Sequence, residues 1–210
     1  MASAITPTNS AANATAACYV SQSRKAFDSL IERRSKSLTV NRFVWFDRKF
    51  ELGLPVWIFP NVVERLRGTP ARVEELTRDV PPAALTRRDG DSWSIQEHVG
   101  HLSDLGALDL ARVSDYEARR ETLSAADLEN RRTHEANHNA RDFRELLAEF
   151  RAERSEFVRR LDGFDGEFVE RSAVHPRLDK LMRVVDFAFF VAEHDDHHLA
   201  AISELIRKFA

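Results

Sequence analysis

The sequence predicts an all-α protein that folds as a helical bundle, and three observations lead to this class. Glycine and proline are scarce, with 7 residues of each in a chain of 210. Four long segments carry apolar residues at the spacing of an amphipathic helix, and loops separate them. No segment shows the clear alternation of apolar and polar residues that marks a half-buried strand. Amphipathic segments of this kind bury their apolar faces against one another in a bundle.

Composition and charge narrow the class of protein further. Hydrophobic residues make up 43% of the chain and charged residues 31%, which is enough for a sizeable core under a solvated surface. The formal net charge of −3 argues against a general nucleic-acid binder, which needs a concentrated basic face. The single cysteine, Cys18, excludes an intramolecular disulfide and a multi-cysteine metal site. No apolar run is long enough to cross a bilayer, so we expect a cytoplasmic protein without a nucleic-acid or membrane partner.

The N-terminal segment differs in composition from the rest of the chain. Residues 1–22 are rich in Ala, Ser, Thr and Asn, and neither a basic residue nor an apolar core precedes Cys18, as an export signal would require. We therefore expect a disordered leader over residues 1–22 and a single domain over residues 23–210. Within that domain, residues 24–34 have the pattern of a short amphipathic helix.

The first long helix is expected between about residues 62 and 80. The preceding residues 41–50 are rich in Phe and Trp but lack a clean period, so we predict an irregular packed segment there. Asn61 has the chemistry of an N-cap, and Pro70 predicts an early turn, a start or a kink in the helix.

The second helix begins at a clear sequence signal. Ser94-Ile95-Gln96-Glu97 forms a capping box, in which the serine side chain accepts from the Glu97 amide and the glutamate side chain reaches back. The helix should run to about Arg120 and carry His98 and His101 near its start.

The remaining elements follow from periodicity and from residues that end helices. A short helical piece over residues 124–130 leads to the polar run 133–139, and a third long helix spans about residues 141–161. A loop through residues 175–177 then precedes the last helix, which covers about residues 182–208.

The last helix carries the most informative motif, within the sequence FAFFVAEHDDHHLAAISEL. His194 and His198 are four residues apart, so they lie one above the other on the same face of a helix. At about 100° per residue, this face also holds five apolar residues within roughly 60° of His194, namely Phe187, Phe190, Val191, Ala201 and Leu205. Two neutral imidazoles aimed into a core suit a divalent cation such as zinc, nickel or iron, although core histidines satisfied by neighbouring side chains would give the same spacing.

A catalytic metal needs about three protein ligands and an open position. The capped helix offers His98 and His101, which are three residues apart, and helical geometry alone does not choose between them. His134 and His138 share the four-residue spacing, but their polar surroundings predict a solvated pair. His197 lies about 60° from the axis of the histidine pair on the last helix, either at the rim of the site or exposed.

Two segments of the chain together resemble a known family. The first, WSIQEHVGHL, joins a tryptophan and a capping serine to an inward-facing His-Leu pair, and the second is EHDDHHLAAI in the last helix. Their order, spacing and helical context resemble the DinB/YfiT-like superfamily over about residues 45–210. The resemblance implies a four-helix bundle with up-down-down-up connectivity and a metal held by three histidines.

The resemblance also implies which residues would hold the metal. The family's first histidine, which is followed by leucine, corresponds to His101, and its paired histidines correspond to His194 and His198. One divalent ion (zinc, nickel, iron or manganese) would then be bound, with water in its open positions. Asp195 and Asp196 stand where many relatives have a glutamate or another residue. At about 100° and 200° from His194, both should point away from the site, although hydrogen bonding to a ligating imidazole is a further role open to them.

The sequence contains no motif that identifies catalytic residues beyond these ligands. There is no Ser/His/Asp arrangement and no glycine-rich phosphate loop, and Cys18 lies in the leader. Glu97 is a candidate general base, although its place in the capping box favours a structural role. Four loop residues are candidates for substrate contacts: Asn137, His138, His175 and Arg177.

Characterised relatives in this superfamily include thiol-dependent S-transferases and isomerases, and others are regarded as metal-dependent hydrolases. The resemblance therefore implies a metal-dependent enzyme that acts on a small molecule. We favour a thiol S-transferase, because a bound low-molecular-weight thiol would make a cysteine nucleophile unnecessary. The alternative is a non-catalytic metal-binding or dimerising module used in storage, sensing or stress response. Dimers are common among such bundles, so a homodimer is possible, but no residue identifies one.

Overall fold

The computed structural model describes residues 42–210, and four helical rods form the body of this part of the chain. The first rod is α2 (Phe59–Thr77), and the second is α4 (Ile95–Asp104) followed at once by α5 (Gly106–Glu117). The third and fourth rods are α7 (Phe143–Asp162) and α9 (Val184–Phe209). The all-α class and the four-helix bundle predicted from the sequence are therefore confirmed.

Two sequence predictions fall outside the described region, namely the leader over residues 1–22 and the short helix over residues 24–34. Where an irregular segment was expected, over residues 41–50, the structure has the short 3-10 turn η1 (Trp45–Asp47) between extended residues. None of the helices in the described part of the chain is both long enough and apolar enough to cross a membrane.

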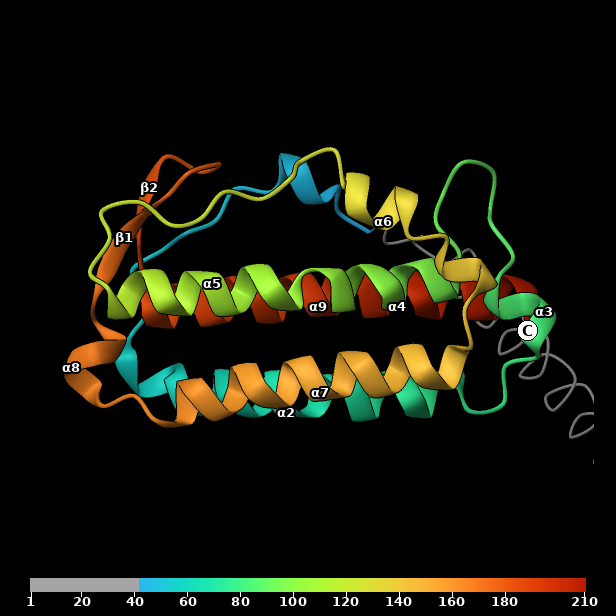
Figure 1. Cartoon of the computed structure of the whole chain (residues 1–210), viewed down its shortest axis with the longest axis horizontal. Helices are drawn as coiled ribbons and strands as arrows, with labels where there is room; N and C mark the ends of the chain where they lie inside the picture. Colours follow the sequence, from blue (N-terminus) through green and yellow to red (C-terminus); the bar gives the residue numbers. More distant parts are fainter. Residues whose placement is uncertain (1–41) are drawn as a thin grey trace, which may run out of the picture. The chain divides into compact units, whose positions relative to one another are not determined.

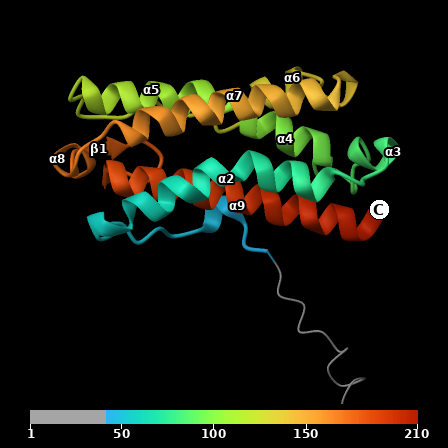
Figure 2. The same ribbon diagram turned by 90° about the horizontal axis from the view of Figure 1, so that it is seen from below.

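The rods are connected up, down, down and up, as Figure 1 shows. α2 and α9 run in one direction and pack against each other, while α4–α5 and α7 run in the opposite direction (Figures 1 and 2). Neighbouring parallel helices need a long connection, and residues 118–142 return along the bundle from α5 to α7. Figure 1 shows this crossover, the segment before α2 and a β-hairpin along one side of the bundle.

The first rod begins earlier than the sequence predicted. α2 begins at Phe59, directly after the 3-10 turn η2 (Val56–Ile58), so Asn61 lies within the first turn and is not the N-cap. Pro60 explains the difference, because a proline in the first turn lacks only an N–H that has no helical partner there. Pro70 lies inside α2 and does not end it.

The predicted continuous helix from residue 95 to about Arg120 is instead two helices. The capping box forms at its start, where Ser94 Oγ accepts from Glu97 N at 3.1 Å and Glu97 Oε2 accepts from Ser94 N at 2.8 Å. The single turn α3 (Pro82–Leu85) precedes it. The interruption lies at Leu105, between α4 and α5. The helix continues at Gly106, where an added Cβ would lie 2.9 Å from Cβ of Glu153 on α7, so the missing side chain lets the two rods approach closely.

The crossover also differs from its prediction. Residues 124–130 form no helix, and the helical turns lie later, in α6 (Arg131–Glu135) and η3 (His138–Ala140). The carboxylate of Asp127 accepts from the N–H of Arg131 at 2.8 Å. Such local side-chain bonds to the backbone compete with helix formation, which explains the shift.

A β-hairpin that the sequence analysis missed lies before α9. β1 (Ser172–His175) pairs antiparallel with β2 (Lys180–Arg183). The register is Ser172–Arg183, Ala173–Met182, Val174–Leu181 and His175–Lys180. Four residues in a strand are too few to establish a two-residue period in the sequence. The crossover joins the hairpin as well, because Leu123 N donates to the carbonyl of Val174 at 3.0 Å.

Acidic side chains fix the starts of the last helices. Asp142 caps α7 by accepting from Arg144 N at 2.9 Å, and Asp165 caps the single turn α8 (Gly166–Val169). Asp186, in the first turn of α9, accepts from the amides of Gly53 and Leu54, both at 2.9 Å. These two bonds connect the segment before α2 to the start of α9.

A layer of buried charges divides the core of the bundle. Arg154 on α7 donates to Asp195 on α9 at 2.8 Å and to Asp109 on α5 at 3.3 Å, and each of the three side chains is almost completely buried. Apolar clusters lie along the helices on both sides of this layer. One includes Phe157 and Phe187, and the other includes Phe150 and Ile202.

Candidate metal centre

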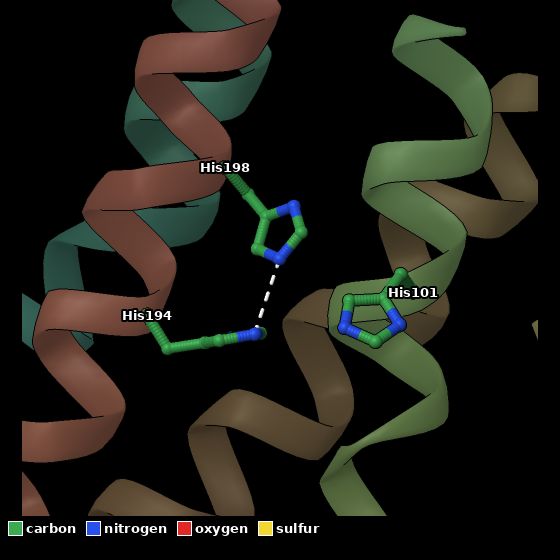
Figure 3. A group of neighbouring side chains, drawn as sticks. All are labelled: His101, His194 and His198. Atoms are coloured by element: carbon green, nitrogen blue, oxygen red, sulfur yellow. Dashed lines mark hydrogen bonds between the residues drawn. The ribbon is translucent and has the colours of Figure 1, made fainter. Parts of the chain in front are cut away.

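Three histidines from two antiparallel rods converge at one point. His101 comes from α4, and His194 and His198 come from α9 (Figure 3). Each offers one ring nitrogen, and these nitrogens all lie within 4.8 Å of one another. The Nε2 atoms of His194 and His198 are 3.1 Å apart. The three residues that the family resemblance selected are therefore the ones that the fold brings together.

Local helical geometry places each of these side chains. On α9, the four-residue spacing stacks His194 under His198 on the inner face, as Figure 3 shows. On α4, the capping box sets the start of the helix and hence which positions face inward. Glu97 is held by this box and by Arg88, whose Nε donates to it at 2.8 Å. This bonding supports the structural role of Glu97 over that of a general base.

In two of the three histidines, the ring nitrogen that faces away from the centre forms a hydrogen bond. His198 Nδ1 is hydrogen-bonded to His98 Nδ1 at 2.8 Å, and His101 Nδ1 is hydrogen-bonded to Thr133 Oγ1 at 3.0 Å. These bonds leave Nε2 of His101 and of His198 to face the centre. Such partners orient ligating histidines and fix which nitrogen is available. His98, which helical geometry could not separate from His101, is therefore a partner of a candidate ligand.

Asp104 anchors the support behind His101. Its carboxylate accepts from Thr133 Oγ1 at 2.8 Å and is bonded to His138 Nε2 at 2.9 Å. His138 is 2% exposed, so the prediction of a solvated histidine pair was wrong for this residue, while His134 is exposed as expected. Gly100 makes the space for His138, because a Cβ at that position would lie 2.3 Å from His138 Cγ.

Burial keeps the three candidate ligands uncharged. It lowers the pKa of His101 to about 4 and holds the pKa values of His194 and His198 well below their ordinary value. A neutral imidazole has a free lone pair on one ring nitrogen, and this is the form that binds a metal.

The donor set fits a divalent cation. At a metal–nitrogen distance of about 2.1 Å, two ligands of a tetrahedral ion lie about 3.4 Å apart. The His194–His198 separation of 3.1 Å is close to this value, and the His101 nitrogen lies within 4.8 Å of the other two. Three imidazoles without a carboxylate or thiolate suit zinc, nickel or iron and select no single metal.

Aromatic rings enclose the histidines. The ring of Trp93 lies 4.7 Å from that of His101 between centroids, and the ring of Trp45 lies 4.8 Å from that of His194. His197 was predicted either at the rim or exposed, and it is half-buried and hydrogen-bonded through Nε2 to Arg42 at 2.8 Å. It is not part of the converging group.

The neighbouring aspartates on α9 bind arginines instead of the centre. Asp195 faces Arg154 inside the bundle, and Asp196 accepts from Arg72 Nη1 at 2.7 Å and also pairs with Arg65. Both therefore point away from the three histidines, in line with their angular positions on the helix. None of the hydrogen bonds found within residues 42–210 links either aspartate to a candidate ligand.

A cavity of about 420 Å³ adjoins the three histidines, which form part of its wall. The bundle contributes residues of α4, α5, α7 and α9, and the other wall comes from residues 42–46, residues 126–130 and the hairpin. Of the four loop residues considered for substrate contacts, His175 and Arg177 line the cavity. Asn137 and His138 do not.

The support of His101 can be tested with Thr133→Val. The valine keeps the shape of the side chain but leaves both His101 Nδ1 and Asp104 without this partner. We expect the affinity for zinc to fall by about 10–100-fold, as is typical when the orienting partner of a ligand is lost. Competition with a chromophoric chelator measures the change. Thr77→Val is the matched control, because the Thr77 hydroxyl donates to the Val73 carbonyl of its own helix and has no other hydrogen bond within residues 42–210. Equal affinity in the wild type and Thr133→Val would contradict this role.

The chain is similar to a known protein family and to a solved structure. A model of the DinB superfamily matches residues 65–202, a range that includes α4, most of α9 and all three histidines. The chain is also similar to the solved structure of YfiT from Bacillus subtilis, a probable metal-dependent hydrolase with an unusual four-helix bundle topology. The match has a TM-score of 0.67 at 19% sequence identity and covers 77% of this chain and 93% of that chain. No curated protein matches the sequence.

Proposed function

The chain belongs to the DinB superfamily, and we propose that it is a metal-dependent enzyme in which His101, His194 and His198 hold one divalent cation. The observation that carries this proposal is the convergence of three uncharged histidines on the wall of a cavity. The cavity has the size of a site for a small organic molecule. Zinc, nickel, iron and manganese are the candidate metals.

Such a cation lowers the pKa of a bound water or thiol and polarises an electrophile. His98 and Thr133 orient two of the ligands, and the rings of Trp45 and Trp93 pack against His194 and His101. The carboxylates near the histidines are already engaged: Asp104 by Thr133 and His138, and Asp109 by Arg154. Because these carboxylates already form hydrogen bonds or ion pairs, they are poor candidates for a general base. The metal site itself would therefore have to promote ionisation of the nucleophile.

A thiol cosubstrate fits this arrangement best. A free thiol has a pKa near 8.5, against about 15.7 for water, so it ionises more readily where no general base assists. Residues 42–210 contain no cysteine, so the sulfur nucleophile of an S-transferase would have to come from a bound low-molecular-weight thiol. We therefore propose thiol S-transfer first. Hydrolysis is the second candidate, and the likeness to a probable metal-dependent hydrolase supports it.

Turnover separates these reactions from a non-catalytic metal-binding module. The full chain, loaded with each of the four metals, would be incubated with monochlorobimane and a thiol, and separately with p-nitrophenyl acetate. Bimane conjugation that needs both metal and thiol supports S-transfer, and ester cleavage without thiol supports hydrolysis. His194→Ala should abolish either activity, while the exposed His134→Ala should not. Tight metal binding without turnover on either probe would contradict the enzymatic proposal and favour a storage or sensing module.

A further inference from the structure

The charged side chains on the cavity wall include more arginines than aspartates. Its charged lining comprises four arginines, Arg42, Arg112, Arg154 and Arg177, and two aspartates, Asp109 and Asp127. Arg42 is paired with Glu204, and Arg154 is paired with Asp109 and with Asp195. Arg112 and Arg177 form no ion pair among residues 42–210. Burial lowers the pKa of Arg112, although the nearby charges of Asp109 and Asp115 raise it in part.

The two remaining guanidinium groups are only partly satisfied. Arg112 is 3% exposed, and its one side-chain hydrogen bond within residues 42–210 runs from Nε to the carbonyl of Ser124 at 2.9 Å. Arg177, in the turn of the hairpin, has a buried Nη2 without a hydrogen-bond partner in the same region. Burial lowers the pKa of Arg177. Desolvated cations of this kind are costly unless an anion joins them.

His175 adds an unused polar atom to the same wall. Its side chain is 1% exposed, and its Nδ1 accepts from Leu178 N at 3.3 Å. Its Nε2 is buried without a partner among residues 42–210. Burial and the charges of Arg112 and Arg177 lower the pKa of His175 to about 4, so the ring is neutral at pH 7. With Nδ1 accepting, Nε2 carries the proton and can donate a hydrogen bond.

The surroundings of these groups are aromatic. The guanidinium carbon of Arg177 lies 5.4 Å from the ring centre of Phe46 and 5.7 Å from that of Phe190. The Phe190 ring also lies 5.3 Å from that of Trp45, which contacts His194. A series of aromatic side chains therefore leads from the arginines to the candidate metal centre.

We propose that Arg112, Arg177 and His175 bind the carboxylate of a small organic acid whose apolar body lies along Phe46, Phe190 and Trp45. A carboxylate matches the planar, two-pronged geometry of a guanidinium, and burial strengthens the bond. The proposal rests on the proposed function in one respect: the reactive group of the same molecule would face the three histidines. It names the substrate class of that site as carboxylic acids with an apolar body.

Two probes of nearly the same shape test the carboxylate site. Isothermal titration of the full chain with 3-phenylpropionate and with 3-phenylpropionamide compares a carboxylate with a neutral amide. We expect the carboxylate to bind at least about tenfold more tightly, the effect of one charge-assisted hydrogen bond. Arg177→Gln should remove this preference and leave the affinity for the amide unchanged. Arg177→Lys should retain part of it, and Arg144→Gln, an exposed arginine outside the cavity lining, should retain all of it.

The titrations would be made on the protein as purified and again after treatment with EDTA. A carboxylate can also bind a metal, so the preference must persist without metal if the arginines cause it. Equal affinities for the two probes, including no measurable binding of either, would overturn the carboxylate site. So would an equal loss of both affinities in Arg177→Gln. A metal-free preference combined with absent turnover would instead support this site while contradicting the enzymatic function.

Discussion

Replacing His194 or His198 with alanine should abolish tight metal binding, and His101→Ala should do the same. Each change removes one of three nitrogens that converge within 4.8 Å, and two imidazoles cannot enclose a divalent ion. The loss should exceed the factor of about 10–100 typical for residues that only orient a ligand. Affinity would be measured by competition with a chelator, with the metal content of each purified variant as a second readout.

His197→Ala is the matched control for these variants. His197 lies on the same helix next to His198, is half-buried and binds Arg42, but it is outside the converging group. It should therefore retain metal at the level of the wild type. Equal losses in His194→Ala, His198→Ala and His197→Ala would show that the assignment of ligands is wrong.

Replacing Arg154 with methionine should lower the free energy of unfolding by about 3–5 kcal/mol, the usual cost of removing one partner from a buried ion pair. Arg154 is the only cation within 4 Å of Asp195 and of Asp109 in the described region, and both carboxylates are buried. Methionine fills much of the volume but leaves the two acids without their bonds. Urea denaturation followed by circular dichroism measures the change.

Arg151→Met is the control on the same helix. Arg151 pairs with Glu74 at 2.6 Å, but both side chains are more than 40% exposed. An exposed pair contributes about 0–1 kcal/mol, so this variant should remain close to the wild type. If Arg154→Met were no less stable than Arg151→Met, the layer of buried charges would have no part in holding the rods together.

The helical class and the approximate positions of the long rods could be predicted because both depend on local patterns. Helical spacing of apolar residues located α7 and α9 to within a few residues, and the capping box located the start of α4. The hairpin could not be found in the same way, because its strands have four residues each and Leu181 is exposed. The break at Leu105 lies beside Gly106, where α5 approaches α7 closely, and such a tertiary contact leaves no local pattern in the sequence.

The site was predictable only where its residues share a helix. The spacing of His194 and His198 placed them on one face, whereas the choice of His101 over His98 needed the family resemblance. Thr133 and Asp104 were missed because the bond between them joins the crossover to α4, and no sequence spacing records that contact. His138 was misjudged for a related reason, since its buried position depends on the space left by Gly100.

The central claim is that the three histidines hold a metal, and its most direct test is the metal content of the wild-type chain. The protein would be purified without a histidine tag, reconstituted separately with zinc, nickel, iron and manganese, freed of unbound ions and analysed by inductively coupled plasma mass spectrometry. The proposal predicts about one tightly bound ion per chain for at least one of these metals. A content near zero for all four would contradict it.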